Sequence, residues 1–202
     1  MGLVIIDVSM SIDGYVAGPN DSDAAPLGEN GTLLHEWVFP PAEQASMVPS
    51  DTQVREELMA RVGAVIVGRR TFDLGLPRWG DVPFPAPSFV LTHREHGELT
   101  MTSGTFTFVT DGPVAALRRA RAAAGDRDVA IMGGHAGRQY LAAGLVDELH
   151  IHLVPVLLGR RVRYRRWVTR GDGVTAAMSQ PAGAAPGSSN SRTPRPSSTG
   201  TR

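Results

Sequence analysis

Short apolar runs alternate with polar, glycine-rich and proline-rich segments along the first 159 residues of the chain. Runs bounded by turn signals are typical of strands, and apolar residues at helical spacing are typical of helices. The pattern predicts strands at Leu3–Val8, Ala64–Val67, Ser88–Thr92, Thr105–Val109, Val129–Met132 and Glu148–Val154, and helices at Leu33–Phe39, Asp51–Arg61, Pro113–Ala124 and from about Ala136 onward. Strands that alternate with helices predict an α/β fold with a mostly parallel central sheet flanked by helices.

The stretch from Ile131 to Gly159 is the most informative part of the pattern, because it reads as a strand, a glycine turn, a helix and a second strand. Gly133 and Gly134 let the backbone turn sharply, and the first amides of the next helix point back into that turn. A helix N-terminus has free N–H donors and a partial positive charge, which suit a phosphate. A plain tight connection fits the same residues, so both interpretations stay open.

Polar and glycine-rich residues follow the predicted strands. In parallel α/β sheets, ligands bind beyond the carboxyl ends of the strands. Such residues occur at five strand ends here: Ser9, Ser11 and Asp13; Gly68 to Thr71; Thr92 to Arg94; Thr110 to Gly112; and Gly133 with Gly134. Because these ends would meet at one edge of the sheet, the sequence predicts a single ligand-binding rim.

Two of these clusters carry arginine. Arg69 and Arg70, followed by Thr71, would place two guanidinium groups and a hydroxyl at a helix start, where they suit a phosphate. The alternative is a solvated surface pair. Residues 92–94 offer a hydroxyl, an imidazole and a guanidinium, which suit a ribose phosphate, and the alternative there is an ordinary polar loop.

Further candidates lie on the first and last predicted strands. The carboxylate of Asp13 would orient a polar substrate or relay a proton, unless it belongs to a simple turn. Val16 and Ala17 supply a small apolar surface for a flat ring. His150 and His152 are two apart on a strand and therefore face one side. Solvated or hydrogen-bonded histidines are favoured over a metal site there, because no further ligand is evident.

Composition narrows the class of protein. A chain of 202 residues is long enough for one domain with a real core. It shows no apolar run of transmembrane length and no secretory pattern, so we expect a cytoplasmic protein. The absence of cysteine excludes disulfides, thiolate metal sites and cysteine nucleophiles. All 20 basic residues are arginine, which excludes lysine Schiff-base chemistry.

The ordered motifs resemble the dihydrofolate reductase-like superfamily, and most closely its bacterial branch related to the reductase domain of riboflavin biosynthesis. The matching segments are residues 9–20, Val67-Gly-Arg-Arg-Thr-Phe72, residues 89–93, Ile131-Met-Gly-Gly134 and residues 143–159. The resemblance implies a dihydrofolate reductase-like fold, NADPH as hydride donor, and a small substrate of pterin, pyrimidine or carbonyl type that is reduced at a C=N or C=O bond. It also implies a homodimer, and nothing in it indicates a membrane partner.

The resemblance assigns positions along the rim. The nicotinamide would be flanked by Val16 and Ala17. The phosphates would be held by Gly68, Arg69, Arg70 and Thr71, the adenosine end with its 2′-phosphate by Leu91, Thr92, His93 and Arg94, and the pyrophosphate by Met132, Gly133, Gly134, Ala136 and Gly137. For catalysis, Asp13 is the first candidate for a polar substrate contact. Glu36 and Trp37, on the short helix that closes the cleft, come second.

The chain departs from the family pattern after Gly159, where a closing pair of strands is expected. Residues 1–159 hold 11 arginines and 19 acidic residues, whereas residues 160–202 hold 9 arginines and a single acid, Asp172. We therefore expect a domain at 1–159 and a tail at 160–202 that is disordered or frame-altered, which would leave the sheet with an exposed edge.

Two alternative functions stay open at this point. The altered end would fit a cofactor-binding remnant without turnover. The run Arg160–Arg170 mixes arginine with Tyr164 and Trp167, which would fit binding to nucleic acid.

Overall fold

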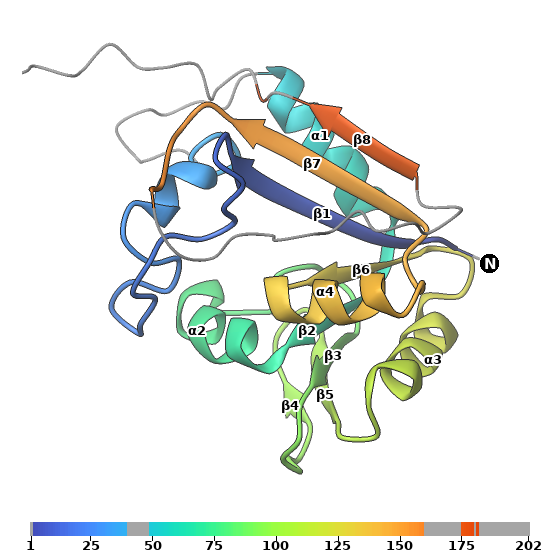
Figure 1. Cartoon of the computed structure of the whole chain (residues 1–202). Helices are drawn as coiled ribbons and strands as arrows, with labels where there is room; N and C mark the ends of the chain where they lie inside the picture. The colour runs from blue at the N-terminus through green and yellow to red at the C-terminus, as the bar shows by residue number, and fades with distance from the viewer. Residues whose placement is uncertain (1, 40–48, 160–174, 180, 182–202) are drawn as a thin grey trace, which may run out of the picture.

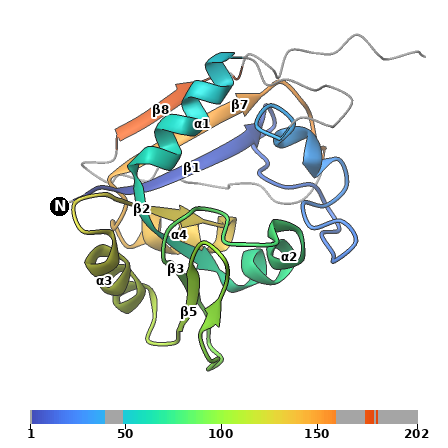
Figure 2. The ribbon, with the colours of Figure 1, turned by 180° about the vertical axis from the view of Figure 1, so that it is seen from behind.

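The computed structural model describes residues 2–39, 49–159, 175–179 and 181 of the chain. An eight-stranded sheet forms the centre, and helices lie on both of its faces (Figures 1 and 2). The strands are β1 Val4–Ser11, β2 Val62–Gly68, β3 Ser88–Leu91, β4 Leu99–Thr100, β5 Thr105–Val109, β6 Asp128–Met132, β7 Glu148–Val154 and β8 Thr175–Ser179. The helices are α1 Pro49–Arg61, α2 Arg69–Trp79, α3 Pro113–Ala124 and α4 Gly134–Ala142, and a short 3-10 helix, η1, spans Gly31–Leu34.

The strand order is β4-β5-β3-β2-β6-β1-β7-β8, and each neighbouring pair is parallel except β4 with β5. Parallel strands need crossover connections, and each of α1 to α4 lies in one of them, from β1 to β2, β2 to β3, β5 to β6 and β6 to β7. The expected mostly parallel sheet flanked by helices is confirmed.

Both faces of the central strands are buried, which explains why β2 reads as a continuous apolar run. On one face, α3 and α4 pack with Leu117 and Tyr140 against residues such as Ile66. On the opposite face, α1 packs with Leu58 beside Val65, and α2 contributes Phe72 to a separate cluster. The core is therefore divided by the sheet, and the carboxyl ends of the strands remain at its edge.

The structure corrects some predicted boundaries. β1 continues to Ser11 instead of ending at Val8, because β7 pairs with it along its outer half. The helix expected at Leu33–Phe39 is replaced by η1 and the turns that follow it. The sequence pattern does not predict α2 as a continuous helix, since Gly75 and Pro77 interrupt it. The strand at Thr105–Val109 and the helix at Pro113–Ala124 are confirmed.

β8 comes from the part of the chain that was expected to lie outside the sheet. Thr175–Ser179 pairs in parallel with β7, from Glu148 opposite Thr175 to His152 opposite Ser179. The expectation that β7 is left as an unpaired edge is therefore wrong. Residues 160–174, 180 and 182–202, including the arginine-rich run, lie outside the described residues, so the disordered or frame-altered tail stays a prediction for them.

Candidate active site

The carboxyl ends of the central strands come together at one edge of the sheet. The register places Val67 opposite Met132, Gly68 opposite Leu91, and Leu91 opposite Val109. The loops after β2, β3, β5 and β6 therefore begin side by side, as expected for the rim, and binding of a ligand there stays a prediction.

A glycine-lined notch lies between the starts of α2 and α4. Gly68 precedes α2, and Gly133 precedes α4 with φ 99°, a conformation that favours glycine. A Cβ atom on Gly133 would lie 2.3 Å from Thr71 Oγ1, and one on Gly68 would lie 3.3 Å from the Cβ of Ala136. The two helix starts can approach this closely because both turns lack side chains.

Neither of these helix starts is capped by a side chain. Their first N–H groups have no partner within the helix, and both ends carry a partial positive charge. One exposed helix N-terminus stabilises an anion by about 0.3–1 kcal/mol, so two that converge contribute about 0.6–2 kcal/mol. The notch therefore fits a phosphate or a pyrophosphate.

The two arginines after β2 have different surroundings. Arg69 Nε donates to both carboxylate oxygens of Asp73, at 2.8 and 2.9 Å, and its guanidinium carbon lies 5.8 Å from the ring centre of Phe108. Its Nη1 is buried without a hydrogen-bond partner among the described residues. Arg70 pairs with Asp21 and leaves 67% of its side chain exposed. Arg69 is therefore the better placed to bind an acceptor from a ligand, because buried donors normally have one.

The loop after β3 borders a cavity of about 440 Å³, whose lining residues are Glu95, His96, Gly97, Phe108 and Thr110. His96 stacks on Phe108 with ring centres 4.6 Å apart and planes 27° apart. Just before it in the chain, Thr92 is buried and its Oγ1 accepts the backbone N–H of Arg94, while His93 and Arg94 are exposed. The roles predicted for residues 91–94 stay predictions, and the sequence interpretation missed the His96–Phe108 pair, which no local motif marks.

β1 has an open edge beyond the end of β6. It pairs with β6 at Val4 and Ile5 but with β7 as far as Ser11. Within the described ranges, no strand pairs with the outer half of β1 on the β6 side. Backbone N–H and C=O groups are therefore offered to the rim, where they suit a planar ligand with its own donors and acceptors.

The loop after β1 is held by its own hydrogen bonds. Ser11 Oγ accepts the N–H of Tyr15 at 2.9 Å, and the carboxylate of Asp13 accepts the backbone N–H groups of Leu158 at 3.2 Å and Gly159 at 2.8 Å. Burial tends to raise the pKa of Asp13, but its hydrogen bonds with Ser11 and with these amides outweigh burial and lower the pKa. Asp13 thus fastens the loop to the segment after β7. Its contact with a substrate stays a prediction.

The other site candidates among the first 40 residues are Val16 and Ala17, which follow this loop, and Glu36 and Trp37, which follow η1. Val16, Ala17 and Glu36 are half-buried. Trp37 is buried, its Nε1 donates to Ser9 Oγ at 3.0 Å, and its ring centre lies 4.6 Å from that of His152. Because the indole N–H is already bound, Trp37 supplies packing here, and the catalytic roles of Glu36 and Trp37 stay predictions.

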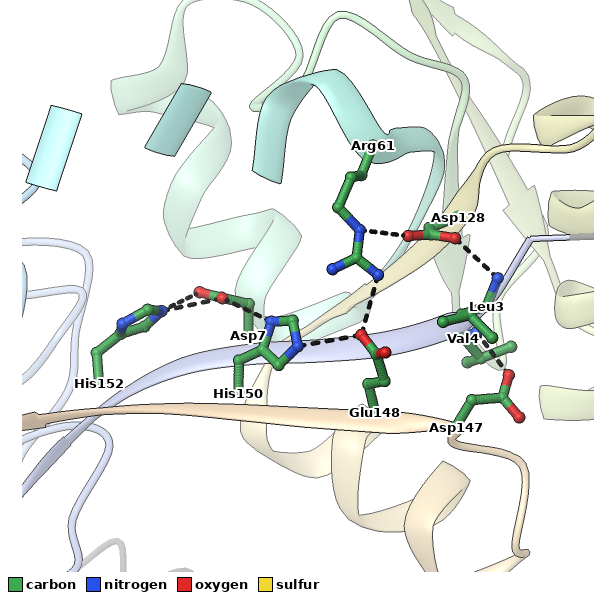
Figure 3. A network of polar contacts seen from close by, with 9 residues as sticks. All are labelled: Leu3, Val4, Asp7, Arg61, Asp128, Asp147, Glu148, His150 and His152. Carbon is green, nitrogen blue, oxygen red and sulfur yellow. Dashed lines mark hydrogen bonds and ion pairs between the residues drawn. The ribbon is translucent and has the colours of Figure 1, made fainter. Parts of the chain in front are cut away.

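The sequence interpretation gave no role to Asp7, a half-buried residue on β1. Its carboxylate binds both His150 and His152 (Figure 3), so the prediction of hydrogen-bonded strand histidines is confirmed. The available signal for Asp7 was a charged residue inside an otherwise apolar strand. The sequence also did not indicate that Asp51, in the first turn of α1, is only 3% exposed.

Comparison with known proteins identifies the family. Residues 3–176 match the model of the RibD C-terminal domain, so the chain belongs to that family. A protein named for riboflavin biosynthesis from Shewanella sp. PV-4 is 24% identical, with a TM-score of 0.54 over 80% of this chain and 81% of that chain. A search of curated proteins found no match.

Two further solved structures are less similar. Dihydrofolate reductase from Enterococcus faecalis, complexed with NADP(H) and RAB-propyl, is 12% identical, with a TM-score of 0.48 over 82% of this chain and 78% of that chain. A pyrimidine reductase-like protein from Corynebacterium diphtheriae is 14% identical, with a TM-score of 0.47 over 77% of this chain and 75% of that chain.

Family and fold together point to a reductase-type oxidoreductase. The predicted relation to the reductase domain of riboflavin biosynthesis is confirmed by the family match. Among the described helices, none has the length and apolar character needed to span a membrane.

Proposed function

We propose that the protein is an NADPH-dependent reductase that transfers a hydride to a C=N or C=O bond of a small pterin-, pyrimidine- or carbonyl-type molecule. The observation that carries this proposal is the meeting of two uncapped helix N-termini, after Gly68 and Gly133, at neighbouring strand ends. Membership in the RibD C-terminal domain family supports the reductase class.

The residues around the glycine notch fit a pyrophosphate. The amides at the starts of α2 and α4 and the hydroxyl of Thr71 would donate to its oxygens. Arg69 has an unused, buried Nη1 donor that would serve a phosphate. Micromolar binding requires about −8 kcal/mol. The two helix ends supply about 0.6–2 kcal/mol of this, so arginine and buried ring surface must contribute most.

The loop after β3 fits the adenosine end. The cavity beside His96 and Phe108 offers aromatic surface for a base. His93 and Arg94 are exposed in the same loop and would bind the 2′-phosphate that distinguishes NADPH from NADH, since guanidinium groups match phosphate in a planar fork. This arrangement favours NADPH over NADH.

The nicotinamide end of the cofactor would lie against β1 and the loop that follows it. The bound cofactor would supply the hydride. Val16 and Ala17 would form an apolar wall, and the open edge of β1 would bind an amide group through its backbone. Trp37, packed with Leu34 and Val154, would help to exclude water. The chain would thus orient two reactants, which is the main contribution of a protein to hydride transfer.

Thermal unfolding with NADPH, with NADH and with neither tests cofactor binding. A ligand present at about 100 times its Kd stabilises the folded state by about 2.7 kcal/mol, which raises the Tm of a domain of this size by about 5–10 °C. We expect a larger rise with NADPH than with NADH. A cooperative unfolding transition that neither cofactor shifts would contradict the proposal.

Turnover separates the reductase from a cofactor-binding remnant. Loss of NADPH absorbance on addition of a pterin, pyrimidine or carbonyl compound would support catalysis. A Tm shift with NADPH, combined with no oxidation in the presence of any compound of these three classes, would instead support the remnant.

We also propose that the protein forms a homodimer. Two apolar side chains, Ile12 and Leu157, are 58% and 72% exposed. They lie on adjacent segments, because the N–H of Ile12 donates to the C=O of Val156 at 3.0 Å. Light scattering should show a dimer whose association weakens in Ile12→Ser. A monomeric wild type would contradict the proposal.

A further inference from the structure

α1 lies over one face of β1 and β7 (Figure 2). A row of charged side chains crosses this face (Figure 3). The parallel register places Asp7 opposite His150 and Ser9 opposite His152, so these side chains share one face. The row runs through Asp128, Arg61, Glu148, His150, Asp7, His152 and Ser179. It therefore connects β6, α1, β7, β1 and β8.

His150 stands between two carboxylates. Its Nε2 lies 3.1 Å from Glu148 Oε2, and its Nδ1 lies 3.5 Å from Asp7 Oδ2. An ionised carboxylate only accepts hydrogen bonds, and a neutral imidazole carries a single N–H. Only the protonated ring can therefore donate toward both acids. The hydrogen bond to Asp7 raises the pKa of His150, and burial, which opposes this, is outweighed.

The other charges of the row also favour the protonated form of His150. Asp128, Glu148 and Asp7 bring three negative charges, whereas Arg61 brings one permanent positive charge, at 2.8 Å from Asp128 and 2.9 Å from Glu148. A proton on His150 reduces the excess of negative charge in a region where the side chains are mostly covered. Losing that proton leaves carboxylates facing a ring nitrogen lone pair.

The other side of Asp7 leads to the rim. His152 Nε2 lies 2.9 and 3.0 Å from the two oxygens of Asp7, and its Nδ1 lies 2.9 Å from Ser179 Oγ on β8. The ring of His152 packs on Trp37, whose N–H is bound by Ser9. One carboxylate thus holds an imidazole that contacts both β8 and the indole.

Asp7 lies just beyond the part of β1 that pairs with β6. The two strands pair at Val4 with Val129 and at Ile5 with Ala130, and no pairing is described for them beyond these positions. Asp7 therefore lies at the start of the open edge of β1, which is the edge proposed to bind the nicotinamide end of the cofactor.

We propose that Asp7, held between His150 and His152, is a positioning residue that fixes Trp37 and strand β8 beside the rim. The contacts of Asp7 with these two histidines form a clamp, which is closed while His150 carries a proton. The effect on turnover rests on the proposed reductase function. The clamp itself does not, because it is defined by contacts within the chain.

The sign of the pH effect follows from the two pKa shifts. The raised pKa of His150 means that its contribution to stability is complete below the ordinary histidine value of 6.5 and is lost as the pH rises through the folded-state value. Burial tends to raise the pKa of Asp7, but hydrogen bonds from His150 and His152 outweigh it, so the pKa is lowered from 3.8. The contribution of Asp7 is lost as the pH falls through that lower value. The clamp is therefore fully closed between pH 3.8 and pH 6.5, and it opens as the pH rises through the folded-state pKa of His150.

Hydrogen exchange of the β8 amides, measured by mass spectrometry and corrected for intrinsic rates, tests the clamp. In the wild type, exchange at 175–179 should become about tenfold faster between about pH 5.5 and about pH 8.5, as expected for the loss of one hydrogen bond to a charged group. Exchange in β3 should not follow this step. His150→Gln should remove the step, and Asp7→Asn should give fast exchange at both pH values. His135→Gln, an exposed histidine on α4, is the matched control and should behave as the wild type.

Tryptophan emission and the pH profile of turnover also test the clamp. Tryptophan emission should follow the same pH step in the wild type and lose it in Trp37→Phe, and the pH profile of turnover should flatten in His150→Gln. If Asp7→Asn does not fold, NMR titration of the histidine rings in the wild type decides, since the pKa of His150 should lie above its ordinary value.

An unchanged pH step in His150→Gln, or an NMR midpoint for His150 at or below the ordinary value, would overturn the clamp. The NADPH-dependent Tm shift is measured separately at about pH 6, where the ordinary histidine is still largely protonated. Its absence would count against the reductase and leave the clamp intact.

Discussion

Replacement of Gly133 by alanine addresses the cofactor notch most directly. At φ 99° an alanine is strained, and its Cβ would lie 2.3 Å from Thr71 Oγ1, where ordinary contact begins near 3.4 Å. The backbone strain costs about 1–2 kcal/mol, and the overpacking adds about 1–3 kcal/mol. Relief of this contact would push the start of α4 away from α2. We therefore expect both lower stability and weaker cofactor binding.

The loss of NADPH affinity can be estimated from the contacts that depend on the Gly133 turn. Displacement of one charge-assisted hydrogen bond from an amide to a phosphate costs about 1.5–3 kcal/mol. This corresponds to a Kd for NADPH that is about 10–100 times weaker. Titration calorimetry at a temperature well below the Tm of the variant measures the Kd, and denaturant unfolding measures the stability.

Gly144→Ala is the matched control for this experiment. Gly144 also has a positive φ, 64°, but no atom lies within 4 Å of the position that its Cβ would take. It should lose stability through backbone strain alone and keep the wild-type affinity for NADPH. If Gly133→Ala bound NADPH as tightly as Gly144→Ala does, the assignment of the notch to the pyrophosphate would be refuted.

Four other substitutions test three separate parts of the structure. Arg69→Gln should weaken NADPH binding about tenfold through loss of a charge-assisted bond, and Arg70→Gln should weaken it less because Arg70 already pairs with Asp21; equal losses in the two titrations would argue against the unused Nη1 donor. Tyr140→Phe removes a 2.7 Å hydrogen bond to a backbone carbonyl, so urea unfolding should show a loss of about 1 kcal/mol with unchanged binding. An undiminished stability would mean that this bond contributes nothing. Asp13→Asn should be less stable than the wild type at neutral pH and equal to it in acid, because the lowered pKa of Asp13 makes its contribution disappear as the pH falls below 3.8; a difference that persists in acid would have another cause.

Some features of the site can be predicted from a few neighbouring residues in the sequence, and others cannot. Gly133 could be found from the sequence because a sharp turn between a strand and a helix has a local requirement that glycine meets. The position of Arg69 after a buried strand could be found in the same way. What distinguished Arg69 from Arg70 was the placement of Asp73 and Asp21, of which only Asp73 lies on the same helix.

The role of Asp13 shows the limit of local reasoning. The sequence placed its carboxylate at the end of a strand, where a substrate contact was a fair hypothesis. The structure adds a contact that the sequence did not indicate: the carboxylate accepts the N–H of Gly159, which lies 146 positions away. The segment after β7 reaches that loop because β7 is the neighbour of β1 in the sheet.

By itself, the sequence determined the α/β class, most strand positions, the family and the glycine turn at the rim, because apolar periodicity and backbone requirements act over a few residues. Tertiary structure alone decided that β8 joins the sheet, that His96 stacks on Phe108, and that Asp7 meets His152 across 145 positions. Such pairs depend on strand order and on crossover connections, which join segments that carry no local sign of one another.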